Sequence, residues 1–401
     1  MSEIAIMGAG ISGLTLALRL QQYGVETTLY SERTADQLRS GRLPNSVVRF
    51  HPTREREREL GVDHWDFPDF GVDAVHLTVS GEHPLAFHGK LSHQASAVDF
   101  RIYLARLLED YENRGGHVVF GPLSVSDAVR HARSGHDLTI VATGWKGLTQ
   151  LFPREPKRSP FERPQRLLCA GLYEGIALPD PIGVSFTVVP GVGEIFQTPF
   201  FSFAGRVSAL MFEAIPGSPL EVLRHLGHED DPARFEATVL KLLERYAPTL
   251  RARVSVPEFR LTRPADLLQG ELTPAVRRAW VSLGGERHAM AVGDAWVLND
   301  PVTGQGANLG SHSAWTLAEA ILDGGPYDER FCRAVEARMW TYAESVCAFT
   351  NAFLEPPLPQ VAGLLAAAAH DQALADAFID NFADPPAMWR MLTSPPVPTT
   401  N

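Results

Sequence analysis

The first 13 residues contain the feature that most constrains the fold. A short apolar run, Ile4–Met7, leads directly into the glycine-rich sequence GAGISG at 8–13, and a helical pattern of leucines follows to about Gly24. Val25–Tyr30 then has the composition of a second strand. Strand, glycine turn, helix and strand in this order predict a βαβ unit at the start of a Rossmann-like domain.

The glycines stand where a dinucleotide-binding turn needs them. Gly8 permits the tight turn, Gly10 lets the backbone approach a pyrophosphate, and Gly13 allows close packing of helix on strand. The start of the helix, at Ile11 and Ser12, supplies N–H donors to the anion. We expect all five residues to contact a dinucleotide; the alternative is a glycine turn without a ligand.

The end of the second strand is where such folds bind the adenosine ribose. An acid usually stands there, roughly 20 residues after the glycines. Here Ser31 occupies that position, and Glu32 and Arg33 follow it. A hydroxyl can still bind a ribose, so Ser31 and Glu32 are both candidates, with Arg33 beside them.

A second glycine-rich segment favours FAD over NAD. Gly293 and Asp294 follow the predicted strand 289–292, and the sequence DPVTGQGAN at 300–308 opens a helix. Asp294 can accept hydrogen bonds from ribityl hydroxyls. The turn directs N–H groups and a positive helix end toward the flavin pyrimidine edge, which becomes negative on reduction. The expected flavin contacts are Gly293, Asp294, Pro301, Gly304, Gln305, Gly306, Ala307 and Asn308.

Composition narrows the class of protein to which this chain can belong. Lys and Arg number 36 against 47 Asp and Glu, a net charge of -11, which disfavours nucleic acid as a partner. Three cysteines suit a reducing cytoplasm. No apolar run reaches the roughly 18 residues of a membrane helix, and no histidine spacing suggests a metal site. The charge alternation at 53–60 predicts a solvated helix, and 31–45 reads as a loop.

These motifs resemble those of the flavoprotein monooxygenases with the glutathione-reductase-type FAD fold. More narrowly, the chain is similar to the oxygenase component of styrene monooxygenase and to the related indole monooxygenases, over essentially its whole length. The further motifs that carry the resemblance are GRLPN at 41–45, AVDFR at 97–101, SPFERPQR at 159–166 and DNF at 380–382.

The resemblance implies a two-component system. A separate NADH-dependent flavin reductase would supply reduced FAD, which would react with O2 to a C4a-peroxyflavin that epoxidises a small aromatic alkene such as styrene or indole. In the strand-end segment 142–144, Thr143 replaces an acid typical of single-component hydroxylases, and Thr143 and Gly144 are expected at the cofactor. The alternatives are a self-sufficient NAD(P)H-dependent aromatic hydroxylase and a non-catalytic FAD-binding subunit.

The resemblance also implies residue roles. Arg42, Leu43 and Asn45 would line the flavin and oxygen side, and Pro301 and Thr303 would lie over the isoalloxazine. We therefore expect Asn45, Arg42, Pro301 and Thr303 to be catalytic, although Asn45 could instead cap a loop.

The expected substrate residues fall into two groups. Aromatic and polar positions on the inserted sheet would form the wall of the pocket, although each could equally be core: Phe186, Phe196, Thr198 and Phe201. Positions that differ between styrene-type and indole-type relatives give a mixed signal: Asn45 and Val47 match the styrene type, whereas Val72, Val75 and Ala95 are closer to the indole type. The natural substrate stays open.

The expected fold is α/β, with a glutathione-reductase-type FAD domain, an inserted mixed β-sheet substrate domain and a helical C-terminus. The FAD domain would comprise 1–50, 90–165 and 285–325. A substrate-side hairpin at 51–89, the substrate domain at 166–284 and the C-terminal helices at 326–401 would complete it. The resemblance further implies a homodimer.

Overall fold

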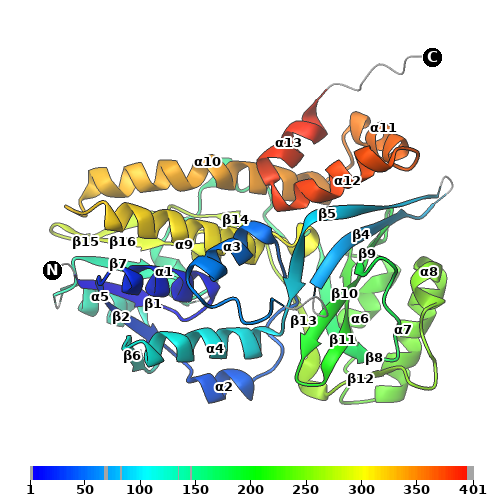
Figure 1. Cartoon of the computed structure of the whole chain (residues 1–401), viewed down its shortest axis with the longest axis horizontal. Coiled ribbons are helices and arrows are strands. Elements are labelled where there is room, and N and C mark those ends of the chain that lie inside the picture. Colours follow the sequence, from blue (N-terminus) through cyan, green and yellow to red (C-terminus); the bar gives the residue numbers. More distant parts are fainter. Residues whose placement is uncertain (1–2, 67–70, 82–83, 134, 145–146, 395–401) are drawn as a thin grey trace.

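Two sheets organise the molecule (Figure 1). The computed structural model describes residues 3–66, 71–81, 84–133, 135–144 and 147–394. The six-stranded sheet has the order β15-β16-β7-β1-β2-β6, and the nine-stranded sheet has the order β12-β8-β11-β10-β9-β4-β5-β3, with β13 also paired to β8. This architecture, with helices at the C-terminus, confirms the predicted fold class.

The six-stranded sheet is the predicted nucleotide-binding layer. All of its pairings are parallel except that between β15 and β16. Its strands are β1 (Glu3–Met7), β2 (Glu26–Ser31), β6 (His117–Phe120), β7 (Leu138–Val141), β15 (Trp280–Gly284) and β16 (Arg287–Ala291). Residues 4–7 of β1 are fully buried, as expected for a central parallel strand covered on both faces.

Helices cover this sheet and pack against one another. Helix α9 packs against α1, and α10 packs against α9. Residues 11–20 of α1 are all buried, because this helix lies between the sheet and its helical neighbours. The helices of this half are α1 (Ile11–Gln22), α2 (Ala35–Arg39), α3 (His51–Glu59), α4 (Phe100–Asn113), α5 (Val125–Arg133), α9 (Gly306–Leu322) and α10 (Glu329–Leu354).

The nine-stranded sheet has two differently covered faces. Adjacent residues of a strand point to opposite faces, so Ile195 packs in the core with α7 while Phe196 packs toward the C-terminal helices. Its strands are β3 (Val48–Arg49), β4 (Gly71–Val79), β5 (Leu85–Ala97), β8 (Leu167–Glu174), β9 (Gly183–Val189), β10 (Gly193–Ser202), β11 (Gly205–Ala214), β12 (Arg260–Leu261) and β13 (Leu267–Glu271). A small sheet pairs β14 (Ala275–Val276) with β17 (Val297–Leu298).

The C-terminal helices close the face that carries Phe196. In Figure 1 they lie at one end of α10, and α12 contacts β5. The remaining helices are α6 (Val222–His225), α7 (Pro232–Tyr246), α8 (Pro248–Arg251), α11 (Pro359–Ala368), α12 (Gln372–Asp380) and α13 (Pro385–Thr393). Among the described residues, no helix combines the length and the apolar character needed to cross a bilayer.

Local predictions differ from the structure in two places. The charged helix at 53–60 is not wholly solvated, because Arg54 and Glu57 of α3 are buried and Glu57 forms an ion pair with the buried Arg49. The segment 31–45 is not all loop, because a capping box between Thr34 and Gln37 starts α2. An alternating pattern of charges in a sequence does not show whether one of the charged side chains has a buried partner of opposite charge.

The sheets also cross two of the predicted domain limits. Strand β5 continues to Ala97, past the limit at 89, and β15 at 280–284 belongs to the six-stranded sheet rather than to the substrate sheet. The division of the chain into segments otherwise stays a prediction.

Candidate active site

The glycine turn between β1 and α1 is shaped as a cofactor cradle. Gly8 has a φ of +113°, and a Cβ atom there would lie 2.5 Å from the Ala142 carbonyl oxygen. A Cβ atom on Gly13 would lie 1.8 Å from the Gly8 carbonyl oxygen, whereas one on Gly10 would meet, among the described atoms, only the Ala142 oxygen, at 3.8 Å. Gly8 and Gly13 are therefore required by the fold, and Gly10 faces open space.

A groove follows the carboxyl ends of β1, β2 and β7. One cavity of about 290 Å³ adjoins a second of about 320 Å³, and the two share residues of the glycine turn and of α4. The residues common to both are Gly10, Pro44, Phe100, Leu104, Ala142 and Gly144. An elongated groove of two linked cavities suits a dinucleotide, whose two halves lie on either side of a pyrophosphate.

The predicted ribose end lines the 290 Å³ cavity. Ser31, Glu32, Arg33, Arg42 and Thr143 are all among its lining residues. The Ser31 hydroxyl donates to the Arg33 carbonyl oxygen at 2.7 Å, so it closes a local turn. Glu32 is exposed and accepts a hydrogen bond of 3.4 Å from the Leu123 N–H. Of the two, the Glu32 carboxylate is the acceptor more open to a ribose.

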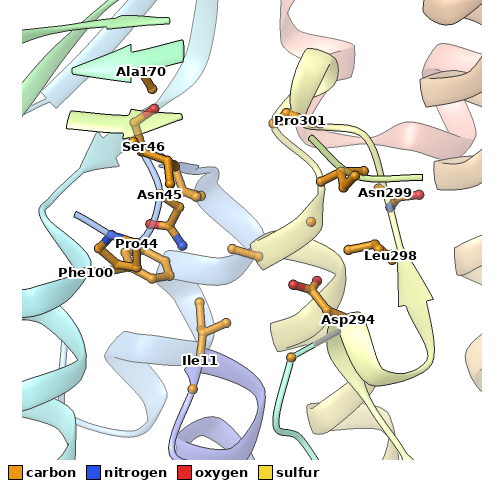
Figure 2. Close-up of a pocket in the computed structure, with 18 of the residues that line it drawn as sticks. Ile11, Pro44, Asn45, Ser46, Phe100, Ala170, Asp294, Leu298, Asn299 and Pro301 are labelled. Carbon is orange, nitrogen blue, oxygen red and sulfur yellow. The ribbon is translucent and has the colours of Figure 1, made fainter. Parts of the chain in front are cut away.

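Two walls face each other across the 320 Å³ cavity, as Figure 2 shows. Pro44, Asn45 and Phe100 stand on one side, and Asp294 and Pro301 stand on the other. The predicted residues that line this cavity are Gly10, Ile11, Ser12, Asn45, Val47, Gly144, Asp294, Pro301, Gly304, Gly306 and Ala307.

Asp294 gives this cavity an acceptor. It lies half-buried on the cavity wall, and burial raises the pKa of its carboxyl group to about 6. Hydrogen-bond donors favour the ionised form of a carboxyl group. A ligand that presents hydroxyl groups here would therefore stabilise the carboxylate.

The turn before α9 forms the opposite end of the groove. Pro301–Thr303 is a 3₁₀ turn, the Asp300 side chain accepts a hydrogen bond from the Val302 N–H at 3.2 Å, and Gly304 adopts φ +67°. The first turn of α9 then begins at Gly306 beside the cavity. Its free N–H groups and positive helix end suit a ligand edge that carries negative charge.

A third, apolar cavity of about 70 Å³ meets the groove at this turn. It shares Ser46, Met211, Pro301 and Gly304 with the 320 Å³ cavity. None of the described residues that line it is charged. Besides Pro301 and Gly304, six predicted residues line it: Val72, Val75, Phe186, Phe196, Thr198 and Thr303. The Phe186 and Phe196 rings stack with centroids 4.5 Å apart. A small apolar molecule bound there would lie next to the cofactor groove.

Several predicted residues support the site without lining it. The Asn308 side chain makes four hydrogen bonds, to Phe50, Thr53, Val48 and Gly304, and so fixes the turn. The Gln305 amide donates to the Thr303 and Phe382 carbonyl oxygens. Gly293 is buried, with φ +59°.

Leu43, Ala95 and Phe201 are further predicted contact residues that line none of the three cavities. Leu43 is 2% exposed, and its neighbours form a small core that includes Phe200. Ala95 is fully buried in the apolar core beneath the third cavity. Phe201 lies toward the far end of β10 from Phe196, against the core of the nucleotide-binding half.

Sequence reasoning missed side chains that only the fold brings to the groove. Phe100 and Leu104 come from α4, Leu168 and Met211 from the nine-stranded sheet, and Asn299 from the segment before the turn. Phe100 belongs to the AVDFR motif at 97–101 and Asn299 directly precedes the segment 300–308, but neither was expected at the groove. No motif marks the other three, because each belongs to an ordinary helix or strand. In the described residues, no cluster of three or more His, Cys, Asp or Glu side chains could hold a metal ion.

The residues present fit the FAD that the sequence predicts. The Gly8–Gly13 cradle would hold the pyrophosphate, Asp294 the ribityl chain, and the turn at Pro301–Ala307 the flavin. The side-chain oxygens of Asn45 and Thr143 are buried beside the groove without a hydrogen-bond partner in the described structure. When bound, the flavin supplies oxygen activation, while the chain binds, orients and excludes water.

Comparison with known proteins identifies the family. Residues 144–253 match a family model described as "Styrene monooxygenase A putative substrate binding domain". Styrene monooxygenase StyA of Pseudomonas fluorescens is 36% identical over 397 residues, which cover 98% of this chain and 95% of that protein. The protein of the same name from a Pseudomonas species is also 36% identical, over 399 residues.

Solved structures share the fold at low identity. The flavin-dependent brominase Bmp2 superposes with a TM-score of 0.69 and 12% identity, over 97% of this chain and 98% of that one. The oxygenase of 2-methyl-3-hydroxypyridine-5-carboxylic acid gives 0.64 and 15%, over 98% and 96%. Together with the site geometry and the near full-length relatives, these findings place the chain in the styrene monooxygenase family, as an FAD-dependent monooxygenase of the oxygenase-component type.

Proposed function

We propose that the chain epoxidises a small aromatic alkene, of the styrene or indole class, with reduced FAD from a separate NADH-dependent flavin reductase. The observation that carries the substrate class is the uncharged 70 Å³ cavity that opens onto the groove at Pro301 and Gly304. Transfer of a neutral aromatic ring from water to such a cavity is favourable, whereas a charged substrate would lose its hydration without gaining an ion pair or hydrogen bond in return.

Three features of the chain would act on the substrate and cofactor. The stacked rings of Phe186 and Phe196 would form one wall against the ring of the substrate, and Asn45 would orient its reacting end. Pro301 and Thr303 would fix the spacing between the two sites. Thr303 suits this positioning role, because its hydroxyl group is buried and hydrogen-bonded to Thr350 at 2.7 Å.

The experiment compares the isolated chain with the chain plus a flavin reductase. The isolated protein should consume little NADH or NADPH, and addition of the reductase, FAD and NADH should give epoxide from styrene or indigo from indole. Rapid NAD(P)H consumption by the chain alone would identify a self-sufficient hydroxylase. FAD binding without any oxygenated product from either compound would identify a non-catalytic subunit.

We also propose a cytoplasmic homodimer that meets its reductase transiently. The three cysteines, Cys169, Cys332 and Cys347, are buried thiols, which suits a reducing compartment. The homodimer rests on the family resemblance. Light scattering should give about twice the mass of the chain, 44.0 kDa; a monomer at micromolar concentration would contradict it.

A further inference from the structure

A cluster of four ionisable side chains lies just behind the turn at Pro301–Thr303, and no step of the proposed function uses it. Glu194 and Glu213 are directly opposite each other in the antiparallel register of β10 and β11. They are buried, and their strands place them two residue pairs along from Phe196 and Met211, which line the substrate cavity. Asp300 and Arg166 complete the cluster.

Among the residues that the structure describes, only one of the three carboxyl groups forms an ion pair with a cationic side chain. The Arg166 guanidinium binds both carboxylate oxygens of Glu194, at 2.6 and 2.9 Å, and also donates to the Phe353 carbonyl oxygen at 3.3 Å. Two like charges directly opposite on neighbouring strands repel each other. Glu213 therefore needs another means of compensation.

The Asp300 carboxyl group provides this compensation for Glu213. Both side chains are at most 1% exposed, and both Glu213 oxygens and the Asp300 Oδ2 have no partner that donates a proton to them in the described structure. The two groups nevertheless lie within hydrogen-bonding reach. Two carboxyl groups can bond only if one of them keeps its proton.

We propose that Glu213 and Asp300 share one proton at neutral pH, and that this acid pair positions the Pro301–Thr303 turn between the flavin groove and the substrate cavity. Glu213 is the donor. Asp300 accepts that bond and, through its other oxygen, the bond from the Val302 N–H. The positioning role rests on the proposed function of this turn, whereas the shared proton does not.

The electrostatic directions agree with this placement of the proton. Burial raises the pKa of Glu213 well above its usual range, and the Asp300 and Glu194 carboxylates raise it further, against the opposing charge of Arg166. Burial also raises the pKa of Asp300, to about 6, while the bonds from Val302 and Glu213 oppose that rise.

The first test uses the protein without FAD. Infrared spectra of the wild-type chain at about pH 8 should contain the carbonyl band of a protonated carboxyl group, with the expected shift in D2O. Glu213→Gln should remove that band, and the exposed-site control Glu258→Gln should retain it. A wild-type spectrum without the band would overturn the shared proton, and this result needs no variant to fold.

The second test is the pH dependence of unfolding, again without FAD. Glu213 keeps its proton when folded and loses it when unfolded, so the unfolding equilibrium constant should rise about tenfold per pH unit relative to Glu213→Gln, from about pH 5.5 to 7.5. A ratio between the two proteins that does not change with pH would show that Glu213 holds no extra proton.

The third test addresses positioning. In the wild-type protein, loss of the shared proton at alkaline pH should weaken FAD binding. A glutamine can donate the same hydrogen bond without titrating, so Glu213→Gln should keep the FAD dissociation constant within about threefold of the wild-type value and should not show this weakening. Glu213→Met, which cannot donate, should raise the constant at least about tenfold. Equal FAD affinity and equal pH profiles in all three proteins would overturn the positioning role. Failure of epoxidation alone would leave the infrared and unfolding results unaffected.

Discussion

Replacement of Gly10 by alanine should separate cofactor binding from folding. The Gly10 backbone has φ -81° and ψ -177°, which alanine adopts without strain. Within the described part of the chain, the only atom that the new methyl group would meet within 4 Å is the Ala142 carbonyl oxygen, at 3.8 Å. The methyl group would otherwise project into the groove, where a pyrophosphate would approach the backbone.

Two opposing effects should leave the free energy of unfolding nearly unchanged. Alanine is a poorer helix N-cap than glycine by about 0.5–1 kcal/mol, and it lowers the entropy of the unfolded chain by a similar amount, about 0.4–1 kcal/mol. Cofactor binding has no such compensation. Loss of one N–H hydrogen bond to a charged phosphate costs about 1.5–3 kcal/mol, which weakens FAD binding about ten- to a hundredfold.

The assay is a titration of oxidised FAD, followed by flavin fluorescence, beside thermal unfolding of the protein without FAD. Gly13→Ala is the matched contrast, because its methyl group would lie 1.8 Å from the Gly8 carbonyl oxygen and must displace the turn itself. It should lower both stability and affinity. An unchanged FAD dissociation constant in Gly10→Ala would refute the placement of the pyrophosphate at this turn.

Three further outcomes are expected. Burial raises the pKa of Asp294 to about 6, and hydroxyl donors of FAD should favour its ionised form, so the FAD affinity of the wild-type protein should weaken as pH falls from about 6.5 to 4.5. Asp294→Asn should make the affinity independent of pH in this range, and an equal pH dependence in both proteins would contradict the contact. Glu57→Gln should cost about 3–5 kcal/mol in chemical denaturation, because it leaves the buried Arg49 without its anion; a loss below about 1 kcal/mol would argue against a charged pair. Val75→Phe should fill the 70 Å³ cavity and lower kcat/KM for styrene at least about tenfold at unchanged FAD affinity; an unchanged kcat/KM would place the substrate elsewhere.

The nucleotide half of the site follows from local sequence. A glycine turn between a strand and a helix needs no distant residue to be recognised, because the backbone conformation at Gly8 and the close packing at Gly13 are short-range requirements. The same holds for the turn at Gly304, where a left-handed residue precedes α9. These positions were therefore predictable.

The predicted roles of Leu43 and Asn308 show the limit of motif reasoning. Both belong to segments that carry the family resemblance. Leu43, however, packs in a core, and the Asn308 side chain makes four hydrogen bonds that hold the turn. A motif preserves the residues that build a site together with those that contact a ligand, and sequence spacing does not separate the two.

The sequence by itself determined the fold class, the cofactor class and the family, because these depend on turns and spacings within short segments. The tertiary structure decided which side chains share a cavity, since Asn45, Met211 and Pro301 meet only where three separate segments converge. It also decided the charge state of the buried groups. Glu213 reads as an ordinary acidic strand residue until the β10–β11 register and the turn at Asp300 enclose it, away from water and from any cation of its own.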